Sequence, residues 1–398
     1  MSLPTFLQPA WPVFKRAHRL ASLWAGYATR LIGHVLGARG APRGARTTSR
    51  TTAEHTHGAV LHEGGPAERR SCSPPAATSA DHWVFSSVPV LDIPGRFTLE
   101  LPHGVVIGDY GAVITEDGML DFETSGYFGI ANWREHPIFL RPVLPPPRDV
   151  RGRLLTLTTR GTSTNYYHFL FDALPRYGIF RECLPHTPVD AVLVPHATRY
   201  QRQLLAMLDL DAVLLQPARG RAWRGDRLLV PSTPNNELAA PAWVVDWLRQ
   251  TFRPRSVDRH DRRLYITRGD RPNTRRFVRE AALWPELERR GFERVDPGTL
   301  SVQEQIDLFH GADVIVGPHG AGLTNLVFCQ PGARILELFA ADYVHLGLWN
   351  ITHSIEGVIY RYLVAPGGAK PGSPMTGVLS DVDIDPAEVL DVVDELIG

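Results

Sequence analysis

The sequence has few of the residues that build covalent or metal-held frameworks. Three cysteines, Cys72, Cys183 and Cys329, are scattered over 398 residues, too sparsely for a disulfide framework or a thiolate metal site. This usage is typical of a reducing compartment, so we expect a cytoplasmic protein. No stretch reaches the roughly 18 uncharged apolar residues of a membrane span. The N-terminus also lacks the apolar run and small-residue cleavage site of a secretory signal.

Net charge is absent as well, because 42 basic residues balance 42 acidic ones. A neutral chain has no global field to attract nucleic acid, and we expect no nucleic-acid partner. Of the basic residues only Lys15 and Lys370 are lysines. A compositional bias of the genome explains this simply, although the planar fork of arginine suits phosphate groups. The length and an apolar content of 43% favour two domains with real cores.

Residues 1–36 predict a basic amphipathic helix, and residues 37–82 predict a disordered linker. One face of the helix would carry the apolar side chains of Leu20, Leu23, Trp24, Tyr27, Leu31 and Val35. The other face would carry Arg19, Ser22, Gly26, Arg30 and Gly33. Such a helix can lie on an anionic membrane surface, with packing on the protein body or a poorly ordered leader as alternatives. The linker is rich in Gly, Ala, Arg, Thr, Ser and Pro, which offer little apolar surface to offset the entropy of ordering.

The remaining chain predicts two α/β domains, at 83–253 and 254–398. Short apolar runs between Val84 and Phe128 indicate strands in hairpins, an added β-rich part before the alternation of strands and helices. The alternation restarts after an arginine-rich stretch, in the order expected of a parallel sheet covered by helices. Asp385 is the expected cap of a final helix over 386–397.

A glycine-rich turn between a buried strand and a helix carries the clearest chemical signal. The strand ends at Gly317, and Gly320 and Gly322 allow close approach of a ligand to the backbone. A helix start presents free N–H groups and a positive dipole end, which favour phosphate. His319 replaces the second glycine of a dinucleotide fingerprint, and the lysine of a Walker loop is missing. A tight turn needed only for packing is the alternative.

Two neighbours of this turn strengthen a phosphate interpretation. Arg268 ends a strand of the same sheet and is expected at its carboxyl edge, where open α/β sheets bind ligands. Glu337 lies in the next strand, where its carboxylate could accept hydrogen bonds from ribose hydroxyls. A surface charge and an ion-pair partner are the respective alternatives. The expected phosphate-binding residues, called the donor side below, are Arg268, His319, Gly320, Ala321, Gly322, Thr324, Asn325 and Glu337.

In the first domain, His168 and Asp172 lie four residues apart in a helical segment. They share a helix face, so the carboxylate can orient the imidazole and support its positive charge. A histidine suits the task of a general base, which takes the proton of an attacking hydroxyl group. A structural histidine–aspartate pair on the helix surface is the alternative.

Four segments in order resemble the family 61 glycosyltransferases, which include bacterial relatives associated with capsular polysaccharide synthesis. The segments are NYYHFLFDALPR, LYITRGDRPNTRR, EQIDLFHGADVIVGPHGAGLTNLVF and ILELF, within residues 84–397. The resemblance implies a GT-B fold of two facing Rossmann-like domains, a nucleotide-sugar donor and inversion. By position, His168 and Asp172 match the family's first-domain segment, with Asn165 and Tyr167 on the acceptor side. Arg279 stands where relatives often have asparagine, which puts donor identity or local packing in question.

No metal or other cofactor is expected. The carboxylate run Asp381–Asp385 lies away from the phosphate turn and is expected in solvent and at a helix cap, while a helix start and Arg268 can neutralise a leaving diphosphate. The expected partners are a nucleotide sugar and a glycan or lipid-linked acceptor. A non-catalytic nucleotide- or glycan-binding module remains an alternative. An α/β-hydrolase would need GxSxG, and Gly161-Thr-Ser-Thr-Asn165 lacks the last glycine.

Overall fold

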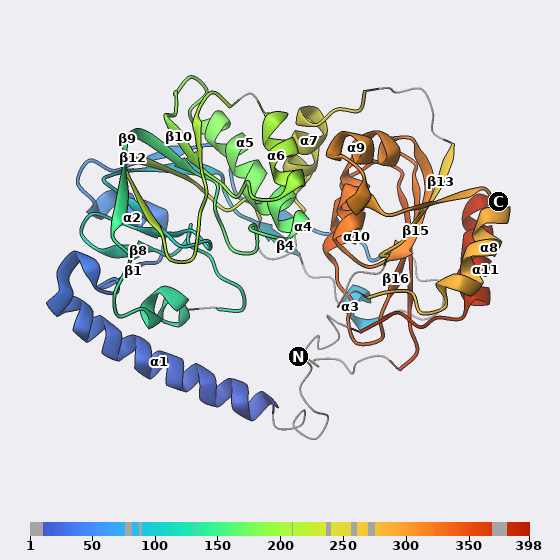
Figure 1. Cartoon of the computed structure of the whole chain (residues 1–398), viewed down its shortest axis with the longest axis horizontal. Coiled ribbons are helices and arrows are strands. Elements are labelled where there is room, and N and C mark those ends of the chain that lie inside the picture. The colour runs from blue at the N-terminus through green and yellow to red at the C-terminus, as the bar shows by residue number, and fades with distance from the viewer. Residues whose placement is uncertain are drawn as a thin grey trace.

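The computed structural model describes most of the chain as two α/β halves, each built on its own sheet (Figure 1). The described residues are 11–75, 82–86, 90–130, 132–208, 210–235, 240–255, 261–269, 275–367 and 380–398. Within these ranges, no helix has the length and apolar composition needed to cross a membrane.

The first half contains a mixed sheet of ten strands in the described residues. They are β1 (Gly44–Arg46), β2 (Val60–Glu63), β5 (Phe97–Pro102), β6 (Val105–Ile107), β7 (Ala112–Ile114), β8 (Met119–Asp121), β9 (Pro147–Thr156), β10 (Ala191–Leu193), β11 (Val213–Leu215) and β12 (Ala222–Pro231). The main order is β1-β8-β7-β6-β12-β9-β10-β11, and β5 pairs with both β12 and β2. Strands β12, β9, β10 and β11 run parallel, whereas β5 and β6 lie antiparallel to β12. The predicted hairpin strands therefore extend the first sheet itself.

The second half contains a parallel sheet in the order β14-β13-β15-β16-β17. Its strands are β13 (Arg262–Ile266), β14 (Phe292–Val295), β15 (Ala312–Pro318), β16 (Arg334–Phe339) and β17 (Ile359–Val364). Alternate residues of β13 point to opposite faces, with Leu264 and Ile266 in one apolar core and Tyr265 in another. Both faces are thus covered, as a parallel sheet requires, and the expected Rossmann-like second half is present.

The helices flank these sheets. They are α1 (Trp11–Leu36), α2 (Ser49–His55), α3 (Trp83–Ser86), α4 (Tyr166–His168), α5 (Leu174–Cys183), α6 (Arg199–Ala206), α7 (Ala242–Thr251), α8 (Glu280–Arg289), α9 (Val302–His310), α10 (Gly347–Thr352) and α11 (Pro386–Ile397). A π-helical turn, η5 (Phe169–Ala173), joins α4 to α5. The 3₁₀ segments are η2 (Gly37–Arg39), η3 (Trp133–Glu135), η4 (Pro137–Leu140), η6 (Pro297–Thr299) and η7 (Ala321–Phe328).

The two halves share a continuous apolar core. Leu157 and Phe169 of the first half belong to the same buried cluster as Ile315 and Ile335 of the second. Helix α7 bridges them as well, because Arg249 Nη1 donates to the Val327 carbonyl oxygen at 2.8 Å. The halves are therefore packed into one body.

The prediction of a disordered linker over 37–82 is wrong for the part that the structure describes. Strand β1 pairs with β8 and β2 pairs with β5. The segment can be ordered with few large apolar residues of its own, because the sheet that it joins supplies the apolar surface against which it packs. Polar contacts replace them in α2, where Ser49 Oγ donates to Asp121 Oδ2 at 2.9 Å and Thr52 donates to the other oxygen. Residues 76–81 lie outside the described residues.

The chain crosses to the second half before the predicted domain start at 83. The small sheet of β3 (Glu68–Arg70) and β4 (Leu91–Ile93) flanks this crossing. Arg70 Nη1 donates to Ser354 Oγ at 2.8 Å, and Phe85 stacks on Tyr362 with ring centroids 4.2 Å apart. Residues near 70 and 85 therefore pack on the second sheet although in sequence they lie between β2 and β5 of the first sheet.

Candidate active site

His168 lies in a helix that departs from α-helical geometry. The helical chain is continuous from α4 through the π turn η5 to α5, and Asn165 Oδ1 caps it by accepting from the His168 N–H at 3.3 Å. Pro175 has no N–H to donate to the Phe171 carbonyl. Asn235 Nδ2 donates to that carbonyl at 3.1 Å instead. Single π turns recur at functional sites because they re-aim side chains.

The predicted pairing of His168 with Asp172 is present. His168 Nδ1 lies 2.7 Å from Asp172 Oδ2, and Asn235 Nδ2 donates to Asp172 Oδ1 at 2.9 Å. An ionised carboxylate accepts the Nδ1–H, which leaves a lone pair on Nε2. Gly161 has φ +75°, and a Cβ there would lie 2.8 Å from the His168 ring. The arrangement holds an imidazole in the tautomer that accepts a proton.

On the facing wall, His319 follows directly after β15. Its Nδ1 pairs with Glu337 Oε1, and the Tyr360 hydroxyl donates to Glu337 Oε2. Burial raises the pKa of Glu337 to about 8. The carboxyl therefore keeps its proton near neutral pH and donates it to His319 Nδ1.

His319 is held neutral. Burial first, and then the cations Arg275 and Arg268, lower the pKa of His319 well below its ordinary value. With Nδ1 accepting from Glu337, the ring carries its proton on Nε2. His319 is thus a hydrogen-bond donor towards the cavity that it lines.

Two arginines converge on the backbone of the glycine-rich turn. Arg268 Nη1 and Arg275 Nε donate to the His319 carbonyl oxygen at 3.0 and 3.1 Å. The Arg275 guanidinium also lies 5.0 Å from the centre of the Tyr343 ring. A Cβ at Gly320 would displace the Arg268 guanidinium. The turn therefore concentrates positive charge where an anionic ligand would approach the backbone.

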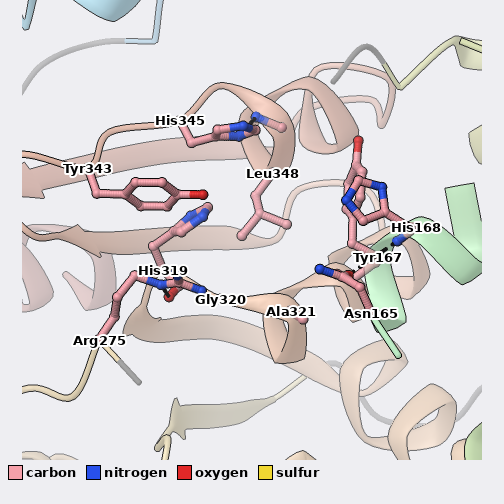
Figure 2. Close-up of a pocket in the computed structure, with 12 residues that line it drawn as sticks. Asn165, Tyr167, His168, Arg275, His319, Gly320, Ala321, Tyr343, His345 and Leu348 are labelled. Carbon is pink, nitrogen blue, oxygen red and sulfur yellow. Dashed lines mark hydrogen bonds between the residues drawn. The ribbon is translucent and has the colours of Figure 1, made fainter. Parts of the chain in front are cut away.

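A cavity separates the two histidines, with Asn165, Tyr167 and His168 opposite Arg275, His319 and Gly320 (Figure 2). Its lining also includes Ala321, Thr324, Tyr343, His345, Gly347 and Leu348. Tyr167 OH and Thr324 Oγ1 are buried and have no hydrogen-bond partner among the described residues. Buried hydroxyl groups normally have a hydrogen-bond partner, so a ligand in the cavity would supply the missing hydrogen bonds of both.

The central cavity continues into hollows on either side. Towards the second sheet, two hollows are lined by Arg268, Gly298, Ala321 and Gly322, and the larger has about 1130 Å³ of empty volume, counting space open to solvent. Towards the first half, another hollow is lined by Phe128, Gly129, Arg160, Tyr167, His168, Asp172, Asn235 and His345. Shared lining residues make these hollows one groove with His168 near its middle.

Two predicted donor-side residues lie outside this groove. Glu337 is fully buried with both oxygens occupied by His319 and Tyr360, so the expected ribose contact is wrong. Asn325 is also fully buried, and its Oδ1 accepts from Tyr166 OH at 2.8 Å across the two halves. Its Nδ2 donates to Gln305 Oε1 and to the Gly322 carbonyl. Asn325 therefore connects the halves beneath the turn.

The predicted helix after the turn is present as the 3₁₀ helix η7. Its N-cap residue, Gly320, follows the His319 carbonyl that Arg268 and Arg275 contact.

Sequence reasoning missed several groove residues. Arg275 stands in the quoted LYITRGDRPNTRR segment and was within reach of a search for phosphate-binding arginines. His345 lines both the central cavity and the first-half hollow, and burial lowers its pKa to about 3, so it is neutral. Asn235 lies 63 residues from Asp172. No spacing rule links residues so far apart, so only the structure reveals the Asn235 contact.

The carboxylate run near the C-terminus is occupied by other contacts. Asp381 Oδ1 accepts from the Arg276 N–H at 2.8 Å, and Asp383 pairs with Arg279 at 2.7 Å. Asp385 Oδ1 caps α11 by accepting from the Ala387 N–H, as predicted. Arg279, the departure from the family pattern, thus affects packing outside the groove. The described residues contain no cluster of three or more His, Cys, Asp or Glu side chains arranged to hold a metal ion.

A parallel sheet with ligand hollows at the carboxyl ends of its strands defines a protein of the Rossmann-like α/β class. Residues 166–336 of this chain match the family model described as Glycosyltransferase 61, in agreement with the resemblance drawn from the motifs. The matched region includes His168, Asp172, Arg268 and the glycine-rich turn.

One curated relative matches a shorter part of the chain. An 85-residue segment is 31% identical to "Beta-1,2-xylosyltransferase RCN11" of Oryza sativa subsp. japonica. The segment covers 21% of this chain and spans 15% of the length of that protein.

Proposed function

We propose that this protein is an inverting glycosyltransferase of GT-B-like arrangement, which moves a sugar from a nucleotide-sugar donor to an acceptor hydroxyl. The observation that carries the proposal is one cavity with a histidine–carboxyl pair on each wall. His168, beside Asp172, offers the lone pair of Nε2, and His319, beside Glu337, offers the proton of Nε2. A reaction that needs a base for one oxygen and a donor for another fits this arrangement.

The donor diphosphate belongs at the glycine-rich turn. Arg268, Arg275 and the backbone from Gly320 to Gly322 present positive charge and N–H groups there. His319 Nε2–H donates to the leaving oxygen as the bond to the sugar breaks. These groups offset the developing negative charge, so the proposal needs no metal ion. The nucleoside would extend along the hollows lined by Gly298 and Gly322.

The acceptor enters from the first-half side. Its hydroxyl oxygen attacks the anomeric carbon from the face opposite the diphosphate, a new C–O bond forms and the C–O bond to the diphosphate breaks. His168 Nε2 takes the hydroxyl proton, and Asp172 stabilises the resulting imidazolium. A single displacement of this kind inverts the anomeric configuration.

The acceptor class follows from the hollow beside His168. The Arg160 guanidinium lies 4.4 Å from the centre of the Phe128 ring, and Asn235 completes the wall. An aromatic face with polar neighbours suits a sugar ring, and we propose a glycan or lipid-linked glycan as acceptor. The motif resemblance supports a role in surface or capsular polysaccharide synthesis, and the three scattered free cysteines support a cytoplasmic location.

A panel of nucleotide sugars tests the proposal. Each compound is added to the purified chain, and the unfolding temperature is measured, because a ligand that binds the folded state raises it. We expect one nucleotide family to raise it, and slow hydrolysis of the matching sugar to follow. Binding without hydrolysis or transfer to any glycan acceptor would support a non-catalytic binding module instead.

A further inference from the structure

Helix α1 is attached to the first half by its face of small and polar residues. Gly26 is buried against Phe139, and Thr29 Oγ1 donates to the Phe139 carbonyl. The Arg30 guanidinium lies 5.1 Å from the centre of the Trp133 ring, and Arg19 pairs with Glu135. These contacts fix the rotation of the helix about its axis.

The opposite, apolar face points away from the protein. Figure 1 shows α1 at the periphery of the first half. Its exposed large side chains are Leu20, Trp24, Tyr27, Leu31 and, at the C-terminal end, Leu36. Trp24 is 73% exposed, the largest fraction among the exposed apolar side chains of the described residues. A helix that only packed on its own protein would turn these side chains inward. An outward apolar stripe instead indicates a surface that something else covers.

Charge indicates what covers it. Residues 1–53 contain eight lysines and arginines and no acidic residue. Arg39 and Arg43 are exposed just beyond the C-terminal end of the helix. Beside them, Val143 is half exposed and bridges to Gly40 through the backbone, which extends the apolar surface.

The aromatic pair on the stripe has the amphipathic character found at membrane interfaces. The rings of Trp24 and Tyr27 meet edge to face, with centroids 6.5 Å apart. Apolar side chains bordered by cations match the boundary between acyl chains and anionic headgroups.

We propose that α1 is an interfacial helix that binds the first half to an anionic lipid bilayer, with the helix axis in the membrane plane. Because Gly26 and Thr29 hold the polar side of the helix on the protein, the stripe from Leu20 to Leu31 faces the acyl chains. The arginines around it contact the headgroups.

Co-sedimentation of the full chain with lipid vesicles tests this proposal. The vesicles contain either phosphatidylcholine alone or phosphatidylcholine with about one-third phosphatidylglycerol. We expect the chain to sediment with the anionic vesicles and to be released by high salt, which screens the headgroup charges. The triple variant Leu20→Ser, Trp24→Ser, Leu31→Ser should lose roughly tenfold or more of its vesicle affinity, because it removes the inserted surface.

A matched variant separates the helix from general surface hydrophobicity. Val213→Ser with Val278→Ser removes two exposed apolar side chains outside α1 and should leave vesicle binding unchanged. Unfolding temperatures of both variants confirm folding. Equal vesicle binding by the helix variant would overturn the proposal. A second result would also overturn it: light scattering shows a wild-type dimer that does not bind vesicles, and the helix variant is monomeric. A second copy of the chain would then cover the stripe.

Discussion

The two walls of the cavity pair the same residue types and produce opposite chemistry. The Asp172 side chain is 14% exposed, and its two oxygens face Asn235 Nδ2 and His168 Nδ1, so a carboxylate there accepts from both and leaves His168 Nε2 with a lone pair. Glu337 is fully buried, so it stays protonated and the partner His319 offers an N–H. The difference teaches that solvent access to the carboxyl group, rather than the presence of a histidine–acid pair, decides which ring is a base.

Replacing either cavity histidine with alanine should have the largest effect on activity. His168→Ala should lower turnover by a factor of about 10² to 10⁴, the usual contribution of a general base, while nucleotide affinity stays near wild type. His319→Ala should lower both, because its N–H contacts the diphosphate. Steady-state kinetics and calorimetry with the nucleotide found in the panel separate the two effects. Near-normal turnover of His168→Ala on the true acceptor would mean that the base lies elsewhere.

Changing the carboxylate beside His168 should have the next largest effect. In Asp172→Asn, the amide oxygen must accept from Asn235, so its NH₂ group faces His168 Nδ1. That contact forces the ring proton onto Nε2 and removes the base. We expect turnover to fall about a hundredfold with unchanged nucleotide affinity. Full turnover in this variant would show that Asp172 does not set the tautomer.

Charge reversal at the turn should weaken donor binding alone. Arg268→Glu removes a guanidinium beside the His319 carbonyl and places a carboxylate in its stead. We expect nucleoside diphosphate affinity to fall by roughly tenfold to a hundredfold, the size of a charged hydrogen bond or more. Arg253→Glu, which changes an exposed arginine outside the groove, is the matched control. Calorimetry giving equal affinities for both variants would exclude Arg268 from the donor site.

The smallest expected effect is a pH dependence that distinguishes the two acids. Below pH 8 Glu337 is protonated and holds the His319 proton on Nε2. As the pH rises through about 8, Glu337 loses its proton to solvent and its carboxylate can only accept a hydrogen bond. The ring proton of His319 then moves from Nε2 to Nδ1, so Nε2 presents a lone pair to the diphosphate. Nucleotide affinity should then fall by up to about tenfold.

In Glu337→Gln the amide donates to Nδ1 at every pH, so its affinity should stay flat over the same range. A parallel decline in wild type and variant would place the titrating group elsewhere.

The sequence predicted the reactive groups of the site better than the residues that pack around them and hold them in place. Local patterns sufficed for the His168–Asp172 pair, the Gly320 turn and the parallel sheet behind it, because spacing along one element fixes them. Glu337 was placed at the right strand with the wrong partner, since burial depends on packing that no local pattern records. The ordered segment after residue 37 was missed for a similar reason: its strands gain their stability from residues far away in the chain.

The apolar core shared by Phe169, Ile315 and Ile335 makes the two halves a single thermodynamic unit. Separating them would expose that core to water at a cost of roughly 25 cal/mol for each Å² of apolar surface. The gap between the histidines is therefore set before any substrate arrives. Heat should melt both halves in one transition, and a nucleotide bound only at the second sheet should slow amide hydrogen exchange in the strands of the first.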